Sequence, residues 1–577
     1  MCRSSAKLHG SRGHKEKNLH ERAYRPRRRY TQKIRQGLAD SIEGRYSRRG
    51  KSVEMSDAAS GRAAIESATK SPAHPYISSQ IRAAIDITYA VALAASIALW
   101  FVAIRAPLWL DETSSYWQIS AGFRQIMPRR GLVSVAYPYI LWFTTRLTGT
   151  SEIALRIPSI LAMLGAVCLL YRSARELFNR DVAIIVAVIF CVHPIVVFSS
   201  IDARPYAFGV LALNAAIFLL VRLRHDSSNW MPAAFGAAAA LTTHFQMLFG
   251  AVLPVLAICF FAAKVGNRKT LMRQALIAFA GFAIVFLPNF SDLIQIFRYR
   301  QAYVFDTTRP SLVELVSTLA PGWLVFVLPV VLALAIFAKK LDVRGRINGW
   351  SFLVCASVGL VPILLLFAVT ALTPTNIFVA RYRLIAIPGI ALWWGWLISR
   401  IDSSFLRALF CVAVVSTAAY KKLTSPDAKE HFYTWKYALE LAEKNAAPDH
   451  ATVLMCSDFP SADYFPMPAG DAAKDSAFFT PLSYYKLSVP VVGLPRALND
   501  QAMRIGSDFM RSAAEKRQRF LVLGYRPSLE TLRWLRKIGA PTYDVAPLGQ
   551  PDGILVLEFT PRTGGPATPR AIEPAAQ

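Results

Sequence analysis

Four short motifs carry charged or polar side chains in an otherwise apolar chain. In the first, Asp111 and Glu112 are adjacent in PLWLDETSSYW, just after a long apolar segment. A carboxylate at such a place can accept the proton of an attacking hydroxyl group if it lies within hydrogen-bonding distance. Adjacent side chains point in different directions, so the two acids are expected to have different partners. The alternative is a solvated loop acid, or an acid that caps a helix beginning at Thr113.

The second motif, Asp202-Ala-Arg204-Pro205-Tyr206, lies where one apolar segment ends and the next begins. An ionisable side chain at this depth is costly unless it is paired or used. The planar guanidinium group of Arg204 is suited to bidentate binding of a phosphate, and Pro205 suits the first turn of a following helix. A local ion pair between Asp202 and Arg204 is the simpler interpretation.

Two further motifs interrupt or open apolar segments. His244 follows two threonines within an apolar stretch. It either packs as a hydrogen-bonded core residue or binds a phosphate, a sugar hydroxyl or a metal ion. Arg381, Tyr382 and Arg383 open another apolar segment, on the side of the membrane where few cations are expected. Binding of an anionic lipid headgroup would explain them, and snorkelling of the arginines to the interface is the alternative.

The elements that must position these motifs are membrane-spanning helices. The 577-residue chain is 54% hydrophobic and 18% charged, whereas soluble domains are about 25% charged. Apolar segments that are long enough to cross a bilayer, or nearly so, predict about eleven spans. They are 86–105, 153–171, 182–199, 206–221, two shorter helices within 230–264, 274–289, 320–338, 351–371, 383–399 and 404–420.

The distribution of positive charge orients these spans. Lysine and arginine are concentrated in alternate short loops and in the N-terminal tail, which places these parts in the cytoplasm. All four motifs then belong to the opposite face, beside apolar and aromatic stretches of the kind that lie in a membrane interface, such as residues 137–149. That face receives the loop 106–152, the turns 200–205 and 372–382, the loop 291–319 and everything after residue 421.

The N-terminal residues 1–82 form a basic tail that we expect to be disordered and cytoplasmic. Residues 1–54 hold 16 Lys/Arg against 5 Asp/Glu, so a large part of the net charge of +28 lies there. No folded basic surface is visible, which argues against a nucleic-acid partner. Met55 opens MSDAASGRAA and is a candidate for the true start, in which case residues 1–54 would not be translated.

Residues 83–424 are expected to form the transmembrane domain, and residues 425–560 a small α/β domain in which strands alternate with helices. Acceptor binding, a lid and an assembly surface all remain open as roles for this domain. Residues 561–577 are rich in Pro, Ala and Thr and are expected to be disordered. The predicted strands are 452–457, 490–493, 519–525 and 553–559, and the predicted helices lie near 429–447, 498–516 and 527–538.

Five pieces of the chain between about residues 85 and 420 resemble, in their order, the GT-C superfamily of polyprenyl-phosphate-sugar glycosyltransferases. The resemblance is strongest to glycosyltransferase family 39 and its bacterial relatives that transfer aminoarabinose or galacturonic acid to lipid A. The pieces are LDETSSYW (110–117), YPYILWFTTRLTGTSEIALRIPSILAMLGAVCLLYRSARELF (137–178), DARPYAF (202–208), LTTHF (241–245) and ARYRLIAIPGIAL (380–392).

The resemblance implies a GT-C type helical fold in a bacterial inner membrane, with the C-terminal α/β domain in the periplasm. It implies a polyprenyl-phosphate sugar as donor and inversion at the anomeric carbon. Asp111 falls on the family's general base, with Glu112 orienting Asp111 or the acceptor. Arg204 and Arg381 would stabilise the leaving phosphate. The other residues implied at the donor site are Tyr206, Tyr382 and His244.

The resemblance does not identify the acceptor, which could be lipid A, another lipid, a polysaccharide or a protein. It establishes no cofactor and leaves a divalent metal ion open. Many relatives carry a charged residue or histidine before a Pro-Pro pair in the first loop, whereas residues 134–138 here read SVAYP. No metal ligand is therefore assigned.

Two other functions remain alternatives to sugar transfer: a lipid or polysaccharide transporter, and a non-catalytic subunit of a membrane assembly. A transporter would more naturally place its charges near the bilayer midplane, in interrupted helices with an internal repeat. We find no such repeat in this sequence.

Overall fold

The computed structural model describes residues 75–129, 134, 136–225, 228–263, 268–298, 309–341, 349–373, 376–425 and 432–563. The chain divides into two compact units, Met1–Ser79 and Gln80–Gln577, and the fold below is that of the second unit. Several predicted features lie outside the described residues. They are most of the basic tail, the candidate start Met55, Val135 of the first loop and residues 564–577.

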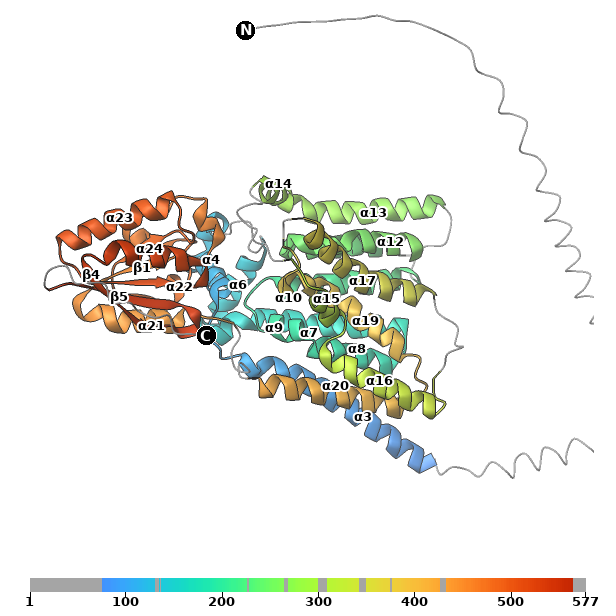
Figure 1. Cartoon of the computed structure of the whole chain (residues 1–577). Coiled ribbons are helices and arrows are strands. Elements are labelled where there is room, and N and C mark those ends of the chain that lie inside the picture. Colours follow the sequence, from blue (N-terminus) through green and yellow to red (C-terminus); the bar gives the residue numbers. More distant parts are fainter. Residues whose placement is uncertain are drawn as a thin grey trace, which may run out of the picture. The chain divides into compact units, whose positions relative to one another are not determined.

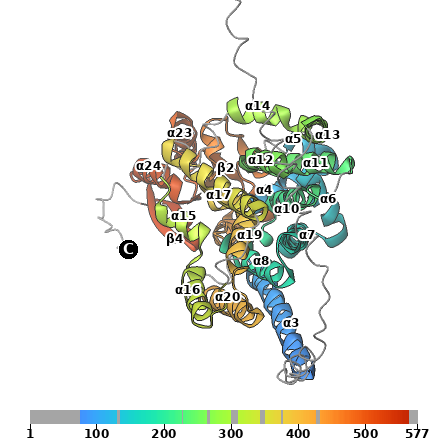
Figure 2. The ribbon, with the colours of Figure 1, turned by 90° about the vertical axis from the view of Figure 1, so that its right-hand side faces the viewer.

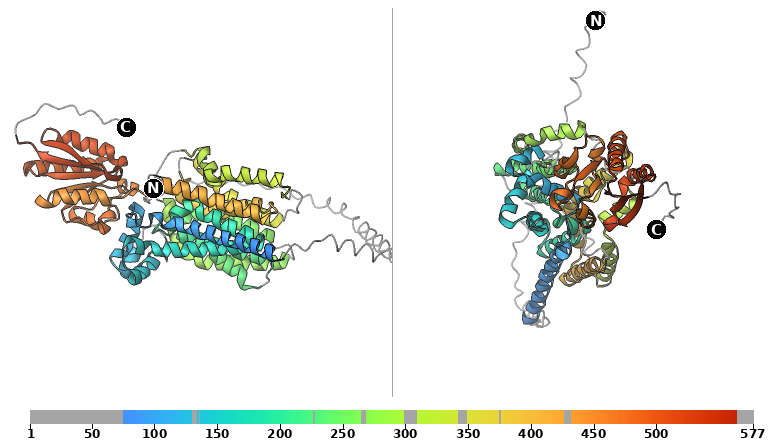
Figure 3. Two further views of the ribbon diagram at one scale, coloured as in Figure 1. Left: turned by 90° about the horizontal axis from the view of Figure 1, so that it is seen from below. Right: turned by 90° about the vertical axis from the view of Figure 1, so that its left-hand side faces the viewer.

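The N-terminal part of this unit is a bundle of apolar helices (Figure 1), and all eleven predicted segments fall on helices. Further views show the same roughly parallel arrangement (Figure 3) and place α3 beside α20 (Figure 2). The helices are α3 (Pro75–Ala98), α7 (Glu152–Leu177), α8 (Arg180–Val192), α9 (Pro194–Ser200), α10 (Tyr206–Leu223), α11 (Trp230–Phe245), α12 (Leu253–Ala263), α13 (Arg268–Phe286), α16 (Gly322–Phe337), α17 (Gly349–Leu372), α19 (Ile387–Ile398) and α20 (Ser404–Thr424).

The predicted number of spans is not confirmed. Six helices among the described residues are apolar and long enough to cross a membrane, or up to eight if each of two bent pairs counts as one span. The difference arises from helices such as α11 and α19, which have 16 and 12 residues and fall short of a full crossing.

A bend between α8 and α9 sets the direction in which the chain reaches the Arg204 motif. The two helices meet at an angle of 71°, at a point where Pro194 supplies no backbone N–H to continue the ladder. His193 stabilises the bend, since its Nδ1 atom accepts from the N–H of Ile195 at 3.3 Å and its Nε2 atom lies 3.2 Å from the carbonyl oxygen of Thr318.

Helices α17 and α19 cross at two glycines that let their backbones touch. A Cβ atom added to Gly359 would lie 2.7 Å from the carbonyl carbon of Gly389, and one added to Gly389 would overlap the backbone of Val358 and Gly359. Small residues at such crossings allow the close packing on which helix association in membranes depends. The crossing lies near the start of α19, which follows the Arg381 motif after the short 3-10 helix η6 (Leu384–Ala386).

We therefore expect Gly389→Ala to destabilise the protein by about 1–3 kcal/mol, the usual cost of forcing extra atoms into a packed interior. The matched control is Gly349→Ala, because an added Cβ atom there meets no atom within 4 Å. The measurement is the thermal unfolding midpoint of the full chain in detergent. Equal midpoints for the two variants would show that the crossing is not under steric constraint.

The predicted loop 106–152 is itself largely helical within its described residues. It contains α4 (Leu110–Ser120), α5 (Ile126–Arg129) and α6 (Ala136–Thr148), whereas the short 3-10 helix η1 (Leu99–Ala103) before it belongs to the predicted span 86–105. Helix α6 covers the predicted interfacial stretch, and its Phe143 and Leu147 side chains are 62% and 72% exposed. Exposed apolar side chains on such a short helix are typical of an interfacial position. Three more short helices, α14 (Phe290–Arg298), α15 (Leu312–Leu319) and α18 (Ala380–Arg383), flank the longer ones.

The C-terminal part contains a five-stranded sheet in the order β2-β1-β3-β5-β4, which confirms the predicted fold class of a helical membrane protein with a small α/β domain. Strand β1 pairs in parallel with β2 and β3, whereas β5 pairs antiparallel with β3 and β4. The elements are α21 (Lys436–Ala446), β1 (Thr452–Cys456), α22 (Pro481–Tyr484), β2 (Val491–Leu494), α23 (Asp500–Glu515), β3 (Phe520–Gly524), α24 (Leu529–Gly539), β4 (Tyr543–Gly549) and β5 (Leu555–Pro561).

The four predicted strands and three predicted helices of this domain are present, but strand β4 was not predicted. The first helix begins at Lys436 rather than near residue 429, and residues 429–431 lie outside the described residues. The sequence of β4, YDVAPLG, lacks a regular alternation of apolar and polar residues because it is an edge strand in which only Tyr543 is fully buried. It also contains Pro547, which lacks the N–H that a central strand would need and is tolerated at a sheet edge.

Candidate functional site

Helix α4 presents the two adjacent acids in its first turn. The helix begins at Leu110 rather than at Thr113, so Asp111 and Glu112 lie within it and do not precede it. Glu112 stabilises this end of the helix, because its Oε2 atom accepts from the backbone N–H of Trp109 at 3.3 Å. Carboxylates are favourable at a helix N-terminus, where backbone N–H groups point outward.

The Glu112 carboxylate is fully buried and forms a bidentate ion pair with Arg156 of α7. Arg156 Nε lies 2.8 Å from Oε1, and Arg156 Nη2 lies 2.6 Å from Oε2. Both side chains are 0% exposed, and the backbone N–H of Ala203 also donates to Oε1 at 2.9 Å. Glu112 thus ties α4 to α7 and to the turn that carries Arg204.

Arg156 extends this network to the end of η1. Its Nη1 atom donates to the carbonyl oxygens of Ile104 and Ala106 at 2.9 and 2.8 Å, and its Nη2 atom donates to that of Pro107 at 3.2 Å. We did not single out Arg156 from the sequence. The sequence did contain a signal for it. Arg156 lies within the apolar stretch that forms α7, and a charge at such a place needs a partner.

Asp111 lies beside two arginines that are distant in sequence. Its Oδ2 atom is 2.9 Å from Nη1 of Arg381 in α18 and 4.0 Å from Nη2 of Arg204. Arg204 also donates to the carbonyl oxygen of Asp111 at 3.1 Å and to Oγ of Ser115 at 3.3 Å. The Asp111, Arg204 and Arg381 side chains are 15%, 10% and 22% exposed, so each retains some access to solvent. The structure therefore brings together three of the predicted site residues.

The two predicted tyrosines each pack against one of these arginines. The Cζ atom of Arg204 lies 5.7 Å from the ring centroid of Tyr206, and that of Arg381 lies 5.2 Å from the ring centroid of Tyr382. These distances are in the range of cation–π attraction. Each tyrosine thus helps to orient the guanidinium group that faces Asp111.

Both guanidinium groups remain charged in spite of their burial. Burial disfavours the charged form of Arg204, yet Tyr206 and the nearby acids hold its pKa above the ordinary value. The pKa of Arg381 is likewise raised against the effect of burial, by Tyr382, Tyr206 and Asp111. A pair of fixed positive charges with restricted water access suits binding of an anion such as a phosphate.

Asp202 and His244 take separate places around this centre. Asp202 Oδ1 accepts from the indole N–H of Trp109 at 3.0 Å, which ties the motif to the residue before α4. His244 is half-buried near the end of α11, with its ring edge-on to Phe245 at 5.8 Å. Phe245 shares a buried cluster with Ile119 of α4 and with Ala203. A role for His244 in binding the donor stays a prediction.

The C-terminal domain fixes the segment that carries Asp111. The backbone N–H of Leu108 donates to the Tyr485 hydroxyl at 2.7 Å, and the Thr434 hydroxyl donates to the carbonyl oxygen of Leu108 at 2.9 Å. One turn into α4, the hydroxyls of Thr113 and Thr480 lie 3.0 Å apart. These contacts constrain α4 from the side opposite the helical bundle.

The residues present do not fit a divalent metal ion at Asp111. Within the described ranges, no three His, Cys, Asp or Glu side chains form a group that could hold a metal. Two guanidinium groups lie at one oxygen of the Asp111 carboxylate, and their positive charge opposes binding of a cation there.

The chain shows likeness to known proteins over part of its length. Residues 133–291 match the family model described as dolichyl-phosphate-mannose-protein mannosyltransferase. This match confirms the resemblance to GT-C glycosyltransferases that the motifs indicated. The matched segment contains Arg204, Tyr206 and His244, while Asp111 and Arg381 lie outside it. No curated protein matches the chain.

Several solved structures show a distant likeness. ArnT from Cupriavidus metallidurans bound to undecaprenyl phosphate has 11% identity over 81% of this chain and 97% of its own, with a TM-score of 0.45. The Archaeoglobus fulgidus oligosaccharyltransferase in the apo form has 12% identity over 82% and 74%, with a TM-score of 0.46. The arabinofuranosyltransferase AftD from Mycobacteria has 15% identity over 82% and 41%, with a TM-score of 0.43. Likeness at this level assigns no residue.

Proposed function

We propose that this protein is an inverting glycosyltransferase that moves a sugar from a polyprenyl phosphate to an acceptor hydroxyl group. The observation that carries this proposal is the position of Asp111, whose carboxylate lies beside two arginines from different segments. A base next to two phosphate-binding cations is what transfer from a phosphate-linked sugar requires. The description of the matching family, which names a dolichyl-phosphate sugar, supports a lipid-linked donor.

In the proposed reaction, the acceptor oxygen attacks the anomeric carbon as the bond from that carbon to the phosphate oxygen breaks. The acceptor proton passes to Asp111, and the bonding electron pair leaves with the lipid phosphate. Negative charge on the phosphate therefore grows in the transition state, where Arg204 and Arg381 stabilise it most. Attack from the side opposite the leaving group inverts the anomeric configuration.

Because Asp111 contacts Arg381, binding of the donor phosphate also changes the surroundings of the base. A phosphate group competes with the Asp111 carboxylate for the same guanidinium, since arginine binds both kinds of oxygen in the same way. When the donor phosphate takes over Arg381, the Oδ2 atom of Asp111 is released from its partner at 2.9 Å. Donor binding then prepares the base for the acceptor proton.

Glu112 acts in this proposal as a positioning residue. Its buried pair with Arg156 holds the first turn of α4 in place, and it therefore orients Asp111 rather than the acceptor. The acceptor is a lipid such as lipid A, a polysaccharide or a protein. We place the reaction on the periplasmic face of a bacterial inner membrane. The N-terminus then lies in the cytoplasm and the C-terminal domain in the periplasm, because the positively charged loops alternate along the chain.

We expect Arg204→Gln and Arg381→Gln each to lower the rate of sugar transfer by about 10²–10³-fold, the usual effect of removing one donor that stabilises developing charge. The measurement is release of polyprenyl phosphate when the purified full chain is mixed with a polyprenyl-phosphate sugar and envelope lipids and glycans as the source of the acceptor hydroxyl.

The matched control for this series is Arg383→Gln in the same short helix. Arg383 donates to the Thr318 hydroxyl at 2.8 Å and lies over the ring of Phe378, away from Asp111. Its replacement should leave the rate within a few-fold of wild type. Similar losses for Arg381→Gln and Arg383→Gln would indicate a general effect of charge and remove Arg381 from the phosphate site.

A further inference from the structure

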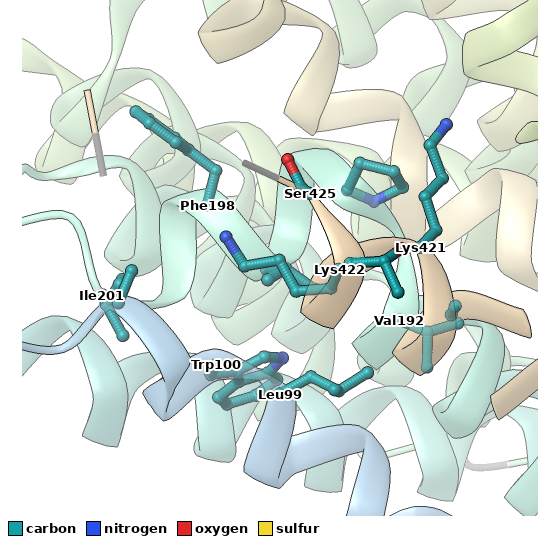
Figure 4. A pocket seen from close by; sticks show the side chains of 13 residues that line it. Leu99, Trp100, Val192, Phe198, Ile201, Lys421, Lys422 and Ser425 are labelled. Atoms are coloured by element: carbon teal, nitrogen blue, oxygen red, sulfur yellow. The ribbon is translucent and has the colours of Figure 1, made fainter. Parts of the chain in front are cut away.

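A pocket of about 500 Å³ lies between η1, the bend from α8 to α9 and the end of α20 (Figure 4). This volume is within the range of small-molecule and cofactor sites. Its walls are formed mainly by apolar side chains, among them Leu99, Trp100, Phe198 and Ile201. The indole N–H of Trp100 already donates to the carbonyl oxygen of Cys191 at 2.9 Å. Trp100 therefore offers the pocket an apolar surface, which suits a hydrocarbon chain.

Two adjacent lysines line the same pocket from the last turn of α20. Lys421 is exposed and Lys422 is half-buried, and Figure 4 shows the Lys422 side chain stretched across the pocket between Phe198 and Trp100. A cation at a helix C-terminus is favourable in itself. That effect does not account for an apolar cavity that the two lysines line. An occupant with a hydrocarbon chain and an anionic headgroup complements both features.

The pocket is separate from the arginine pair of the proposed donor site. Helix α9 contacts η1, which lines the pocket, and also contacts α18, which carries Arg381. Neither Arg204 nor Arg381 lines the pocket. A phosphate held at Lys421 and Lys422 would thus be a different phosphate from the one that binds Arg204 and Arg381.

We propose that this pocket binds one anionic phospholipid of the surrounding bilayer, with an acyl chain against the apolar walls and its phosphate at Lys421 and Lys422. The occupant would also support the Asp111 segment. The ring of Phe198 lies 6.1 Å from that of Trp109, the residue directly before α4. A filled pocket therefore restrains Phe198 and, through it, the start of α4. This proposal goes beyond sugar transfer and does not depend on it.

The test is retention of lipid by the purified full chain in nanodiscs that contain equal amounts of phosphatidylglycerol and phosphatidylcholine, followed by native mass spectrometry. Wild type should keep one phosphatidylglycerol molecule in preference to phosphatidylcholine. The double variant Lys421→Gln/Lys422→Gln should bind phosphatidylglycerol up to about thirtyfold more weakly, because each partly exposed ion pair with the lipid phosphate contributes up to about a factor of five. Ala418→Phe, which fills the pocket wall, should remove retention of either lipid.

The matched control is Lys339→Gln/Lys340→Gln, an exposed lysine pair that follows α16 and does not line this pocket. It should retain phosphatidylglycerol as wild type does. The proposal is overturned if wild type keeps both lipids equally, or if the two double variants lose the same amount. It is also overturned if Lys421→Gln/Lys422→Gln weakens binding of the polyprenyl-phosphate donor and leaves phosphatidylglycerol unaffected, since the pocket would then belong to the substrate.

Discussion

Replacing Asp111 with Asn is expected to lower the rate of sugar transfer by about 10²–10⁴-fold, the range typical of a general base. The amide keeps the size of the carboxylate but cannot take the acceptor proton. Because Asp111 is partly exposed and does not belong to the buried pair of Glu112 and Arg156, the fold should remain intact. The measurement is product formation and release of polyprenyl phosphate, with the thermal unfolding midpoint recorded in parallel.

The same variant gives a second, opposite result for donor binding. The neutral amide of Asp111→Asn no longer competes with the lipid phosphate for Arg381, so the affinity for polyprenyl phosphate should equal or exceed that of wild type. The control is Asp544→Asn, because the Asp544 side chain is 73% exposed and pairs with Arg562. A variant with weaker lipid binding and unchanged turnover would show that Asp111 holds the lipid and does not act as the base.

A transporter would lose flux without releasing polyprenyl phosphate in any variant.

Replacing Arg156 with Met is expected to destabilise the protein by about 3–5 kcal/mol, because it leaves the Glu112 carboxylate buried without its partner. The carbonyl oxygens of Ile104 and Ala106 also lose a donor. The expected result is a strongly lowered thermal unfolding midpoint and a poor yield of folded protein.

Two comparisons separate this effect from a simple loss of positive charge. Arg562→Met breaks a pair in which Asp544 is 73% exposed, and such surface pairs contribute about 0–1 kcal/mol. The double variant Glu112→Gln/Arg156→Met should recover part of the loss, since no unpaired charge remains buried. If Arg156→Met proves as stable as Arg562→Met, the buried pair does not hold α4 in place.

The helices were predictable because long apolar segments have few alternatives to membrane helices. The alternation of basic loops further predicted one common face for the four polar motifs, and the structure brings Asp111, Arg204 and Arg381 of three of them together. The sequence could not indicate which side chains meet there. Asp111 contacts residues 93 and 270 positions away, and spacing over such distances carries no information about contact. These contacts depend on how the helices pack, and the Gly359–Gly389 crossing is one determinant of that packing.

The different roles of Asp111 and Glu112 could not be predicted from the sequence either. Asp111 and Glu112 are chemically similar neighbours, and a helix turn of 3.6 residues separates adjacent side chains by about 100°. The two side chains therefore face different surroundings. Which one faces the interior is decided by Arg156, whose place in α7 directs its guanidinium group to Glu112.

The most direct test of the central claim is mass spectrometry of envelope lipids and glycans from cells that lack this protein, complemented with wild type or with Asp111→Asn. We predict that one sugar residue disappears from a lipid or glycan without the protein, and that only wild type restores it. An unchanged glycan profile, or full restoration by the Asn variant, would contradict the account of a glycosyltransferase with Asp111 as its base.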